Sequence, residues 1–373
     1  MREIGEEIVS KHSASVDRDA RFPYEAFEAL KAEGLMGAYV PEHLGGMGMT
    51  ITQLGALCYE LGHHCGSTAM IFAMHQIMVA CIVHHHESSD YLIGYLENVS
   101  QKQWLLASGH SEIGTGGDLA ISKCALEPKD QGFSITKLAP VISYAEDADA
   151  IALTCRRGPE AQERDQVQII LNREDYVLER LSDWDTLGMR GTCSLGYTLN
   201  GTGKNEQIFP VPFSNITKMT MSPVAHILWG YLWAGIANDA FEKARIVATG
   251  HARKKPGTTP PSVQRLSQAD SELFLIRSSL ANLALEYEQK LSEQNIAVFD
   301  DINFAIKINN LKVTCSEKAF EVVMIAMMIC GIAGYRNDSE LSLGRNVRDI
   351  ISASIMINND RLLGNCGVLH TSV

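Results

Sequence analysis

The stretch ASGHSEIGTGGD, residues 107–118, has the glycine content of a phosphate-binding loop but not its context. A dinucleotide-binding loop has the spacing G-x-G-x-x-G and opens a helix within a βαβ unit. Here Gly114, Gly116 and Gly117 give G-x-G-G, and short runs of β-forming residues follow where the helix would begin. No G-K-[ST] follows, as a P-loop requires. The stretch therefore predicts a loop that enters a β domain, either as a plain surface turn or as part of another kind of site.

The segments on either side of this loop differ in their hydrophobic period. Residues 1–106 carry apolar residues three and four apart, and one segment there is apolar on nearly every face. Residues 107–218 contain short runs rich in Val, Ile, Thr and Tyr, whereas residues 219–373 return to long helical patterns. The sequence therefore predicts an α+β multidomain protein, with an N-terminal all-α domain (1–106), a central β-sandwich or barrel (107–218) and a C-terminal four-helix bundle (219–373).

The composition is typical of a globular protein that does not bind nucleic acid. The chain has 373 residues, of which 46% are hydrophobic, and a formal net charge of −12, which opposes binding to a phosphate backbone. Its nine cysteines form no C-x-x-C pair, which favours a reducing compartment. The first residues form no apolar leader, and no uncharged apolar run reaches the roughly 18 residues of a membrane span. We expect a cytoplasmic protein without a membrane span.

Further motifs accompany the glycine-rich loop. They are SEIGTGGD (111–118), KLAPVISY (137–144), DTLGMRGTCS (185–194), ARKKPG followed by Gln264 (252–264), and LKVTCSEKAFEVVMIAMMICGIAGY with RNVRD (311–349). Each resembles a motif of the acyl-CoA dehydrogenase family, and together they keep the family's order over most of the chain. The first resembles T-E-P-x-A-G-S-D, with Gly117 in place of the serine. The chain is thus similar to a divergent member of this family.

The resemblance implies the acyl-CoA dehydrogenase fold, a bound FAD, and a homotetramer or homodimer. The implied substrate is an acyl-CoA or an acyl-carrier thioester, and the implied electron acceptor is an electron-transfer flavoprotein or O₂. Carried over by position, Ser111 and Ser143 would contact the flavin ring. Arg253, from a neighbouring subunit, would meet the flavin pyrophosphate. The adenine and ribityl side would be lined by Gln264, Gly331 and Asn359.

The catalytic base that this family uses is missing. Dehydrogenation of a thioester needs a base for the α-proton, donors for the carbonyl oxygen and flavin N5 as hydride acceptor. The two positions that carry a glutamate in the family hold Ile357 and Ala225 here. His226 is the best replacement, because histidine titrates near neutrality. Asp360 is the next candidate, because an alignment shift of one helical turn would bring it into range.

Two other activities fit a chain without this carboxylate. One is a flavin-dependent monooxygenase or N-hydroxylase of the same fold, which uses reduced flavin and O₂ and needs no α-proton base. The other is a non-catalytic subunit that pairs with an active homologue. The principal prediction remains a flavoprotein oxidoreductase that dehydrogenates an acyl thioester.

The substrate side is predicted from aromatic and apolar residues. Trp229 and Trp233 lie four apart on the first bundle helix, where they form either core packing or a wall that shortens an acyl pocket. Gly117 and Ile357 complete the predicted substrate residues, and both replace residues usual in the family. The run His84-His85-His86 predicts no metal site, because adjacent histidines on a helix point about 100° apart.

Overall fold

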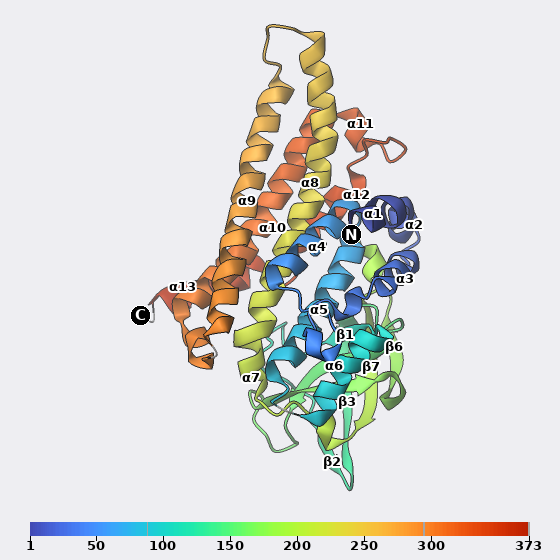
Figure 1. The fold of residues 1–373 in the computed structure, drawn as a ribbon, viewed down its shortest axis with the longest axis vertical. Coiled ribbons are helices and arrows are strands. Elements are labelled where there is room, and N and C mark those ends of the chain that lie inside the picture. The colour runs from blue at the N-terminus through green and yellow to red at the C-terminus, as the bar shows by residue number, and fades with distance from the viewer. Residues whose placement is uncertain (88, 294, 372–373) are drawn as a thin grey trace.

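The computed structural model describes residues 1–87, 89–293 and 295–371, and its helices and strands form three parts. Helices come first, a block of strands follows, and long helices complete the chain. Figure 1 shows the β domain at one end of the molecule and the hairpin of α8 and α9 reaching toward the other, with the N-terminal helices beside them. The predicted fold class, α+β with helices on either side of a β block, is confirmed.

In the N-terminal part, the described residues form six α-helices and a few short helical turns of other types. They are α1 Arg2–Ile4, α2 Ser10–Arg18, α3 Tyr24–Ala32, α4 Ile51–His64, α5 Gly66–His85 and α6 Asp90–Lys102. Thr50 and Gln53 start α4 with a reciprocal capping box. Among the described residues, helix α5 is long and apolar enough to cross a membrane, but 89% of its most apolar 18-residue stretch is buried inside the protein. This burial is that of a core helix.

The central part contains two small sheets. Its strands are β1 Leu106–Gly109, β2 Glu127–Lys129, β3 Gly132–Ile142, β4 Ala150–Arg156, β5 Gln166–Asn172, β6 Tyr176–Ser182 and β7 Leu195–Gly203. One sheet has the order β1-β4-β5 and the other β2-β3-β7-β6. The pair β1 and β4 is parallel, with Leu106 opposite Ala150, and the remaining named pairs are antiparallel. Burial alternates along β3, so that one of its faces is in the core and the other faces solvent.

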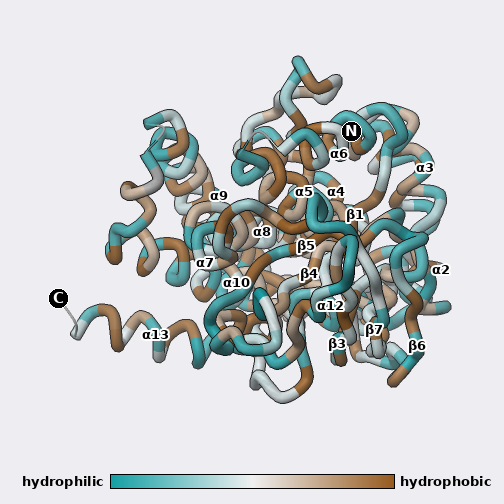
Figure 2. Tube along the Cα trace, turned by 90° about the horizontal axis from the view of Figure 1, so that it is seen from below, coloured by the Kyte–Doolittle hydropathy of each residue, from teal (hydrophilic) through white to brown (hydrophobic). Residues whose placement is uncertain are grey.

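The C-terminal part is dominated by three long helices. Its α-helices are α7 Phe213–Ile216, α8 Ser222–Lys254, α9 Pro261–Ser292, α10 Ile302–Cys330, α11 Ile332–Tyr335, α12 Gly344–Ile355 and α13 Asn359–Thr371. Helix α8 packs against α9, α10 and α4. Figure 2 shows α13 projecting away from the body. The chain leaves the helical conformation between α12 and α13, where Ile357 has a positive φ of 46°.

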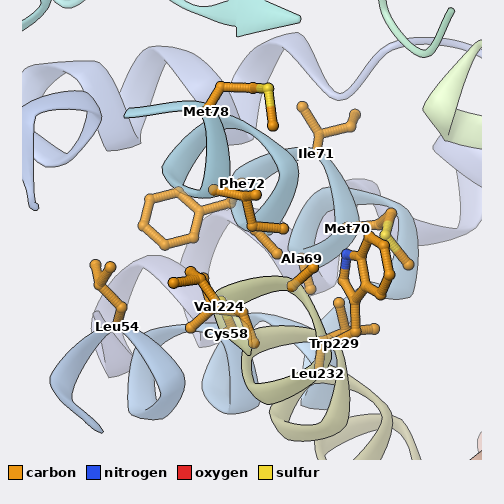
Figure 3. Packing of buried hydrophobic residues seen from close by; sticks show 14 of the residues in the cluster. Leu54, Cys58, Ala69, Met70, Ile71, Phe72, Met78, Val224, Trp229 and Leu232 are labelled. Carbon is orange, nitrogen blue, oxygen red and sulfur yellow. The ribbon is translucent and has the colours of Figure 1, made fainter. Parts of the chain in front are cut away.

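The core joins the N-terminal and C-terminal helices. Figure 3 shows Leu54 and Cys58 of α4 and Phe72 of α5 beside Val224 of α8, and all four are fully buried. Helices α4 and α8 approach closely at Gly62, where a Cβ atom would lie 2.4 Å from the carbonyl oxygen of Leu232. This contact sets the spacing between α4 and α8, and the cavity described below is lined by the start of α8.

Candidate active site

A cavity of about 930 Å³ lies where the three parts of the chain meet. Helix α5 lines one side, the loop after β1 and the end of β3 line another, and the start of α8 and the α12–α13 connection complete the wall. A volume of several hundred Å³ is typical of cavities that hold a cofactor or a small substrate. No Asp or Glu is among the described residues of this wall.

The apolar part of the wall is rich in methionine. Six methionines contribute to it, from four different segments: Met70, Met74, Met78, Met189, Met221 and Met356. Trp229 lies beside them, and its indole Nε1 is buried without a hydrogen-bond partner in the described structure. Flexible thioether side chains fit aromatic or irregular apolar molecules. An unpaired buried donor favours an acceptor on the occupant of the cavity.

The polar part of the wall is a chain of hydroxyl groups. Ser143 Oγ lies 2.7 Å from Ser194 Oγ, which lies 2.8 Å from Thr192 Oγ1. Thr192 in turn donates to the carbonyl of Met189 at 2.8 Å. Ser111 also lines the cavity. The structure thus brings the two predicted flavin-ring residues, Ser111 and Ser143, into one wall and adds Ser194, which the sequence analysis did not single out.

His110 is a site residue that the sequence analysis missed. It lies in the cavity wall, with Nδ1 2.8 Å from Ser108 Oγ and its ring stacked on Phe213 at 5.5 Å. Burial lowers the pKa of His110 to about 3, so the ring is neutral near neutral pH. The signal was its position directly before Ser111, inside the quoted loop.

The two candidate bases have different surroundings. His226 lines the cavity, and its Nδ1 lies 3.1 Å from the carbonyl oxygen of Ile308. Because a carbonyl only accepts, Nδ1 carries the proton and Nε2 keeps its lone pair. Burial lowers the pKa of His226 to about 4. Asp360, in contrast, is exposed on the first turn of α13 and is not among the cavity residues, so the expected one-turn shift does not bring it into range.

The two positions that lack a glutamate do lie in the cavity wall. Ala225 and Ile357 both contribute to it. The carbonyl of Ile357 accepts a hydrogen bond from the buried Lys312 ammonium at 2.8 Å, and Asn359 Oδ1 accepts a second at 2.7 Å. Burial, together with the nearby Arg361, lowers the pKa of Lys312 to about 8. Lys312 therefore holds the strained turn that ends α12.

Asn359 and Trp233 are corrections to the predicted site. The amide of Asn359 contacts Lys312 and Ser316 behind the wall, so it is not free to line the ribityl side of a cofactor. Trp233 is fully buried and its ring lies 5.7 Å from the Lys312 ammonium, so it belongs to the core and not to the cavity wall.

Three predicted cofactor residues lie away from the cavity of their own chain. Arg253 and Gln264 are exposed near the tip of the α8–α9 hairpin. Gly331 has a φ of 57° and is the C-cap residue of α10. A contact of Arg253 with a cofactor in a neighbouring subunit stays a prediction.

Glu112, the acidic residue of the quoted loop, anchors the loop and does not enter the cavity. Its carboxylate accepts hydrogen bonds from Ser122 Oγ at 2.7 Å and from the backbone N–H of Cys124 at 2.6 Å. The buried Lys137 ammonium lies 3.6 Å away. Burial alone would raise the pKa of Glu112, but Lys137 and these donors outweigh it and hold the pKa below its usual value of 4.5.

Comparison with known proteins agrees with this arrangement. Residues 1–96 match the family model described as acyl-CoA dehydrogenase, N-terminal domain. The amino sugar nitrososynthase DnmZ of Streptomyces peucetius is 22% identical over 91% of this chain and 84% of its own length. The probable acyl-CoA dehydrogenase YngJ of Bacillus subtilis is also 22% identical, over 94% of this chain and 90% of its own length.

Among solved structures, FMN-bound TdsC from Paenibacillus sp. A11-2 superposes with a TM-score of 0.84 at 16% identity and covers 98% of this chain and 94% of its own. The fold and the cavity at its three-part junction define a protein of the acyl-CoA dehydrogenase fold. Residues 1–96 match the N-terminal domain of the acyl-CoA dehydrogenase family, and the whole chain has the fold of these proteins. The relatives include dehydrogenases, monooxygenases and nitrososynthases, so the similarity alone leaves the reaction open.

Proposed function

We propose that the chain is a flavin-dependent monooxygenase that acts on a compact, largely apolar substrate. The observation that carries this proposal is the absence of a carboxylate from the described cavity wall. Removing a positioned general base typically costs about 10²–10⁴-fold in rate, so an acyl-CoA dehydrogenase of the usual kind would be a poor catalyst here. Oxygen insertion into a heteroatom or aromatic ring needs no base for an α-proton.

A flavin fits the residues that are present. The hydroxyl groups of Ser143 and Ser194 are hydrogen-bonded to each other, and Ser111 lines the same cavity. Together they offer donors and acceptors to the polar edge of a planar ring. The unpaired Nε1 of Trp229 favours a further acceptor in the cavity. FAD is the cofactor expected for the family, and Arg253 of a second copy would meet its pyrophosphate. TdsC binds FMN, so acid release and chromatography of the bound flavin is the measurement that distinguishes the two.

The protein's own residues then have definite tasks. A reduced flavin held in this cavity would supply two electrons to O₂, so that, with two protons, one oxygen atom would enter the substrate and the other would leave as water. The methionine-lined wall receives the substrate and excludes bulk water, which protects the reactive complex. His226 stays neutral, and its Nε2 lone pair accepts a hydrogen bond from a substrate N–H or O–H. His110 is neutral as well, so neither ring adds positive charge to the cavity.

Dehydrogenation of an acyl-CoA or acyl-carrier thioester is the second candidate, and His226 is the observation that favours it. Its Nε2 is the neutral lone pair that could take an α-proton in place of the missing glutamate. An electron-transfer flavoprotein or O₂ would then reoxidise the flavin. This candidate requires His226 to act as a base although burial lowers its pKa to about 4, which weakens its driving force.

One experiment separates the two reactions. Purified, flavin-loaded protein is mixed anaerobically with a panel of acyl-CoA thioesters, and the visible flavin band is followed. If the protein is a monooxygenase, no thioester changes its visible flavin absorbance. It then consumes O₂ and converts an aromatic or amine substrate when a flavin reductase is added. Bleaching by a thioester would reject the proposal in favour of dehydrogenation. A colourless protein that takes up no flavin and co-purifies with a homologue would instead identify a non-catalytic subunit.

The surface supports a homo-oligomer. Apolar side chains on α9, α10 and α11 are exposed in the single chain, including Phe274 at 67%, Met328 at 62% and Ile332 at 73%. Large apolar side chains left exposed on helices that pack together, as α9 and α10 do, are typical of interaction surfaces. We therefore propose a homodimer or homotetramer, which light scattering after size-exclusion chromatography measures. The cysteines of the chain are unpaired, which supports a reducing, cytoplasmic location.

A further inference from the structure

Arg361 lies in the cavity wall on the first turn of α13. Its Nη1 donates a hydrogen bond to the carbonyl of Gly117, in the glycine-rich loop that also lines the cavity. Within the described part of the chain, no carboxylate forms an ion pair with this guanidinium, and its Nε and Nη2 donate to no protein acceptor. The neighbouring carboxylate of Asp118 accepts from the backbone of Ala120 instead.

The donors of the other cations near the cavity are already bonded to protein acceptors. Arg348 also lines the wall, but both of its Nη groups bond to the carboxylate of Asp17, and Nη1 also donates to the carbonyl of Leu187. The Lys312 ammonium is behind the wall and is occupied by the α12–α13 turn. Among the described residues of the cavity wall, Arg361 is therefore the cation that lacks an ion-pair partner. Its place at a helix N-terminus adds to the local positive potential.

The glycine-rich loop leaves room for this guanidinium. A Cβ atom on Gly117 would lie 3.1 Å from Arg361 Nη1, and the φ of 77° at this residue favours glycine. Gly116, with a φ of 61°, has no atom within 4 Å of its would-be Cβ. No side chain from these two positions covers the guanidinium, so an incoming group can approach its free edge.

We propose that Arg361 binds an oxyanion of the substrate, a carboxylate being the simplest, while the apolar part of the substrate lies among the methionines. The free Nε/Nη2 edge of the planar guanidinium matches the two oxygens of a carboxylate, and the wall, whose described residues include no Asp or Glu, presents no charge that would repel it. The inference names the substrate class of the proposed monooxygenase site and rests on that site being the substrate cavity. It adds to the proposed function that the substrate is an organic acid with a compact apolar body.

The test compares two probes that differ in charge and little in shape, naphthalene-2-carboxylate and naphthalene-2-carboxamide. Their equilibrium binding to the purified protein is measured by calorimetry at neutral pH, with and without bound flavin. We expect the carboxylate to bind about tenfold more tightly than the carboxamide, as one charge-assisted pair would provide. The preference should weaken as salt is added.

Three variants make the result specific. Arg361→Gln should remove the preference for the carboxylate and leave binding of the carboxamide nearly unchanged. Arg361→Lys should keep part of the preference, because the charge remains and the planar fork is lost. Arg265→Gln, at an exposed position on α9, is the matched control and should behave like the unmodified protein. Thermal melts of all three variants check that each is folded.

The inference is overturned if the unmodified protein binds both probes equally, or if the preference survives in Arg361→Gln. Failure of the proposed function looks different. In that case the carboxylate preference persists in the binding assay, but no O₂-dependent product forms with any reduced flavin, or a thioester bleaches the bound flavin.

Discussion

Replacing Glu112 with alanine should destabilise the protein strongly although the side chain never touches the cavity. The substitution removes the acceptor for Ser122 Oγ and for the backbone N–H groups of Lys123 and Cys124. It also removes the carboxylate from Lys137, whose side chain is 1% exposed and which then keeps only the carbonyl of Thr154 as an acceptor.

The magnitude follows from what is left unpaired. Removing one partner of a buried ion pair costs about 3–5 kcal/mol, because the remaining charge stays desolvated. Each buried N–H left without an acceptor costs about 1–3 kcal/mol, but these terms overlap because the loop can relax toward water. We therefore expect a loss of about 3–5 kcal/mol, against the roughly 5–15 kcal/mol that stabilises a typical domain.

Urea unfolding followed by circular dichroism measures this loss. Glu163→Ala is the matched control, because Glu163 pairs with Lys123 of the same segment while both side chains are 51% exposed. Such an exposed pair contributes about 0–1 kcal/mol. Glu112→Gln should fall between the two, since it keeps an acceptor oxygen but loses the charge. A loss below about 1 kcal/mol in Glu112→Ala, or a loss equal to that of the control, would refute the anchoring role.

The same carboxylate gives a pH dependence with a definite sign. Because the folded protein holds the pKa of Glu112 below 4.5, the folded state favours the charged form more than the unfolded state does. Its contribution is complete above pH 4.5 and is lost as the pH falls through the folded pKa. Glu112→Gln should therefore lose less stability than the unmodified protein over this acidic range, and parallel acid-unfolding curves for the two would contradict the assignment.

Three further predictions concern the cavity and the core. His226→Ala should reduce oxygenation by less than about tenfold but reduce any thioester dehydrogenation by about 10²-fold or more, and stopped-flow absorbance measures both. Lys312→Met should lower the free energy of unfolding in urea by about 1–3 kcal/mol, because the carbonyl of Ile357 and the side-chain oxygen of Asn359 lose their donor. It should also raise KM, and an unchanged KM would show that the turn between α12 and α13 does not shape the cavity. Gly62→Ala should lower the melting temperature because its Cβ would meet the carbonyl of Leu232 at 2.4 Å, whereas Gly94→Ala, where no atom lies within 4 Å of the new Cβ, is the control.

Local sequence patterns determined the order of elements and part of the site. The change from helical to strand periodicity near Ala107 is a property of neighbouring residues, so it can be read without knowing any distant contact. Ser111 and Ser143 could be placed because each belongs to a motif of several adjacent residues. The break at Ile357 could not be read in this way, because it depends on the ammonium of Lys312, 45 positions earlier in the sequence.

Only the tertiary structure decided which polar groups face the cavity. Asp360 and His226 were both candidate bases in the sequence, but helix α13 exposes the former to solvent and the packing of α8 on α10 buries the latter with one nitrogen bonded to Ile308. In the sequence Arg361 is one arginine beside an aspartate, and only the fold shows that it lines the cavity without forming an ion pair with a described carboxylate. The hydrophobic period depends only on residues that are neighbours in the sequence, so the fold could be predicted from it. Ion pairing and protonation depend on groups brought together from distant segments, so the chemistry of the cavity could not be predicted in the same way.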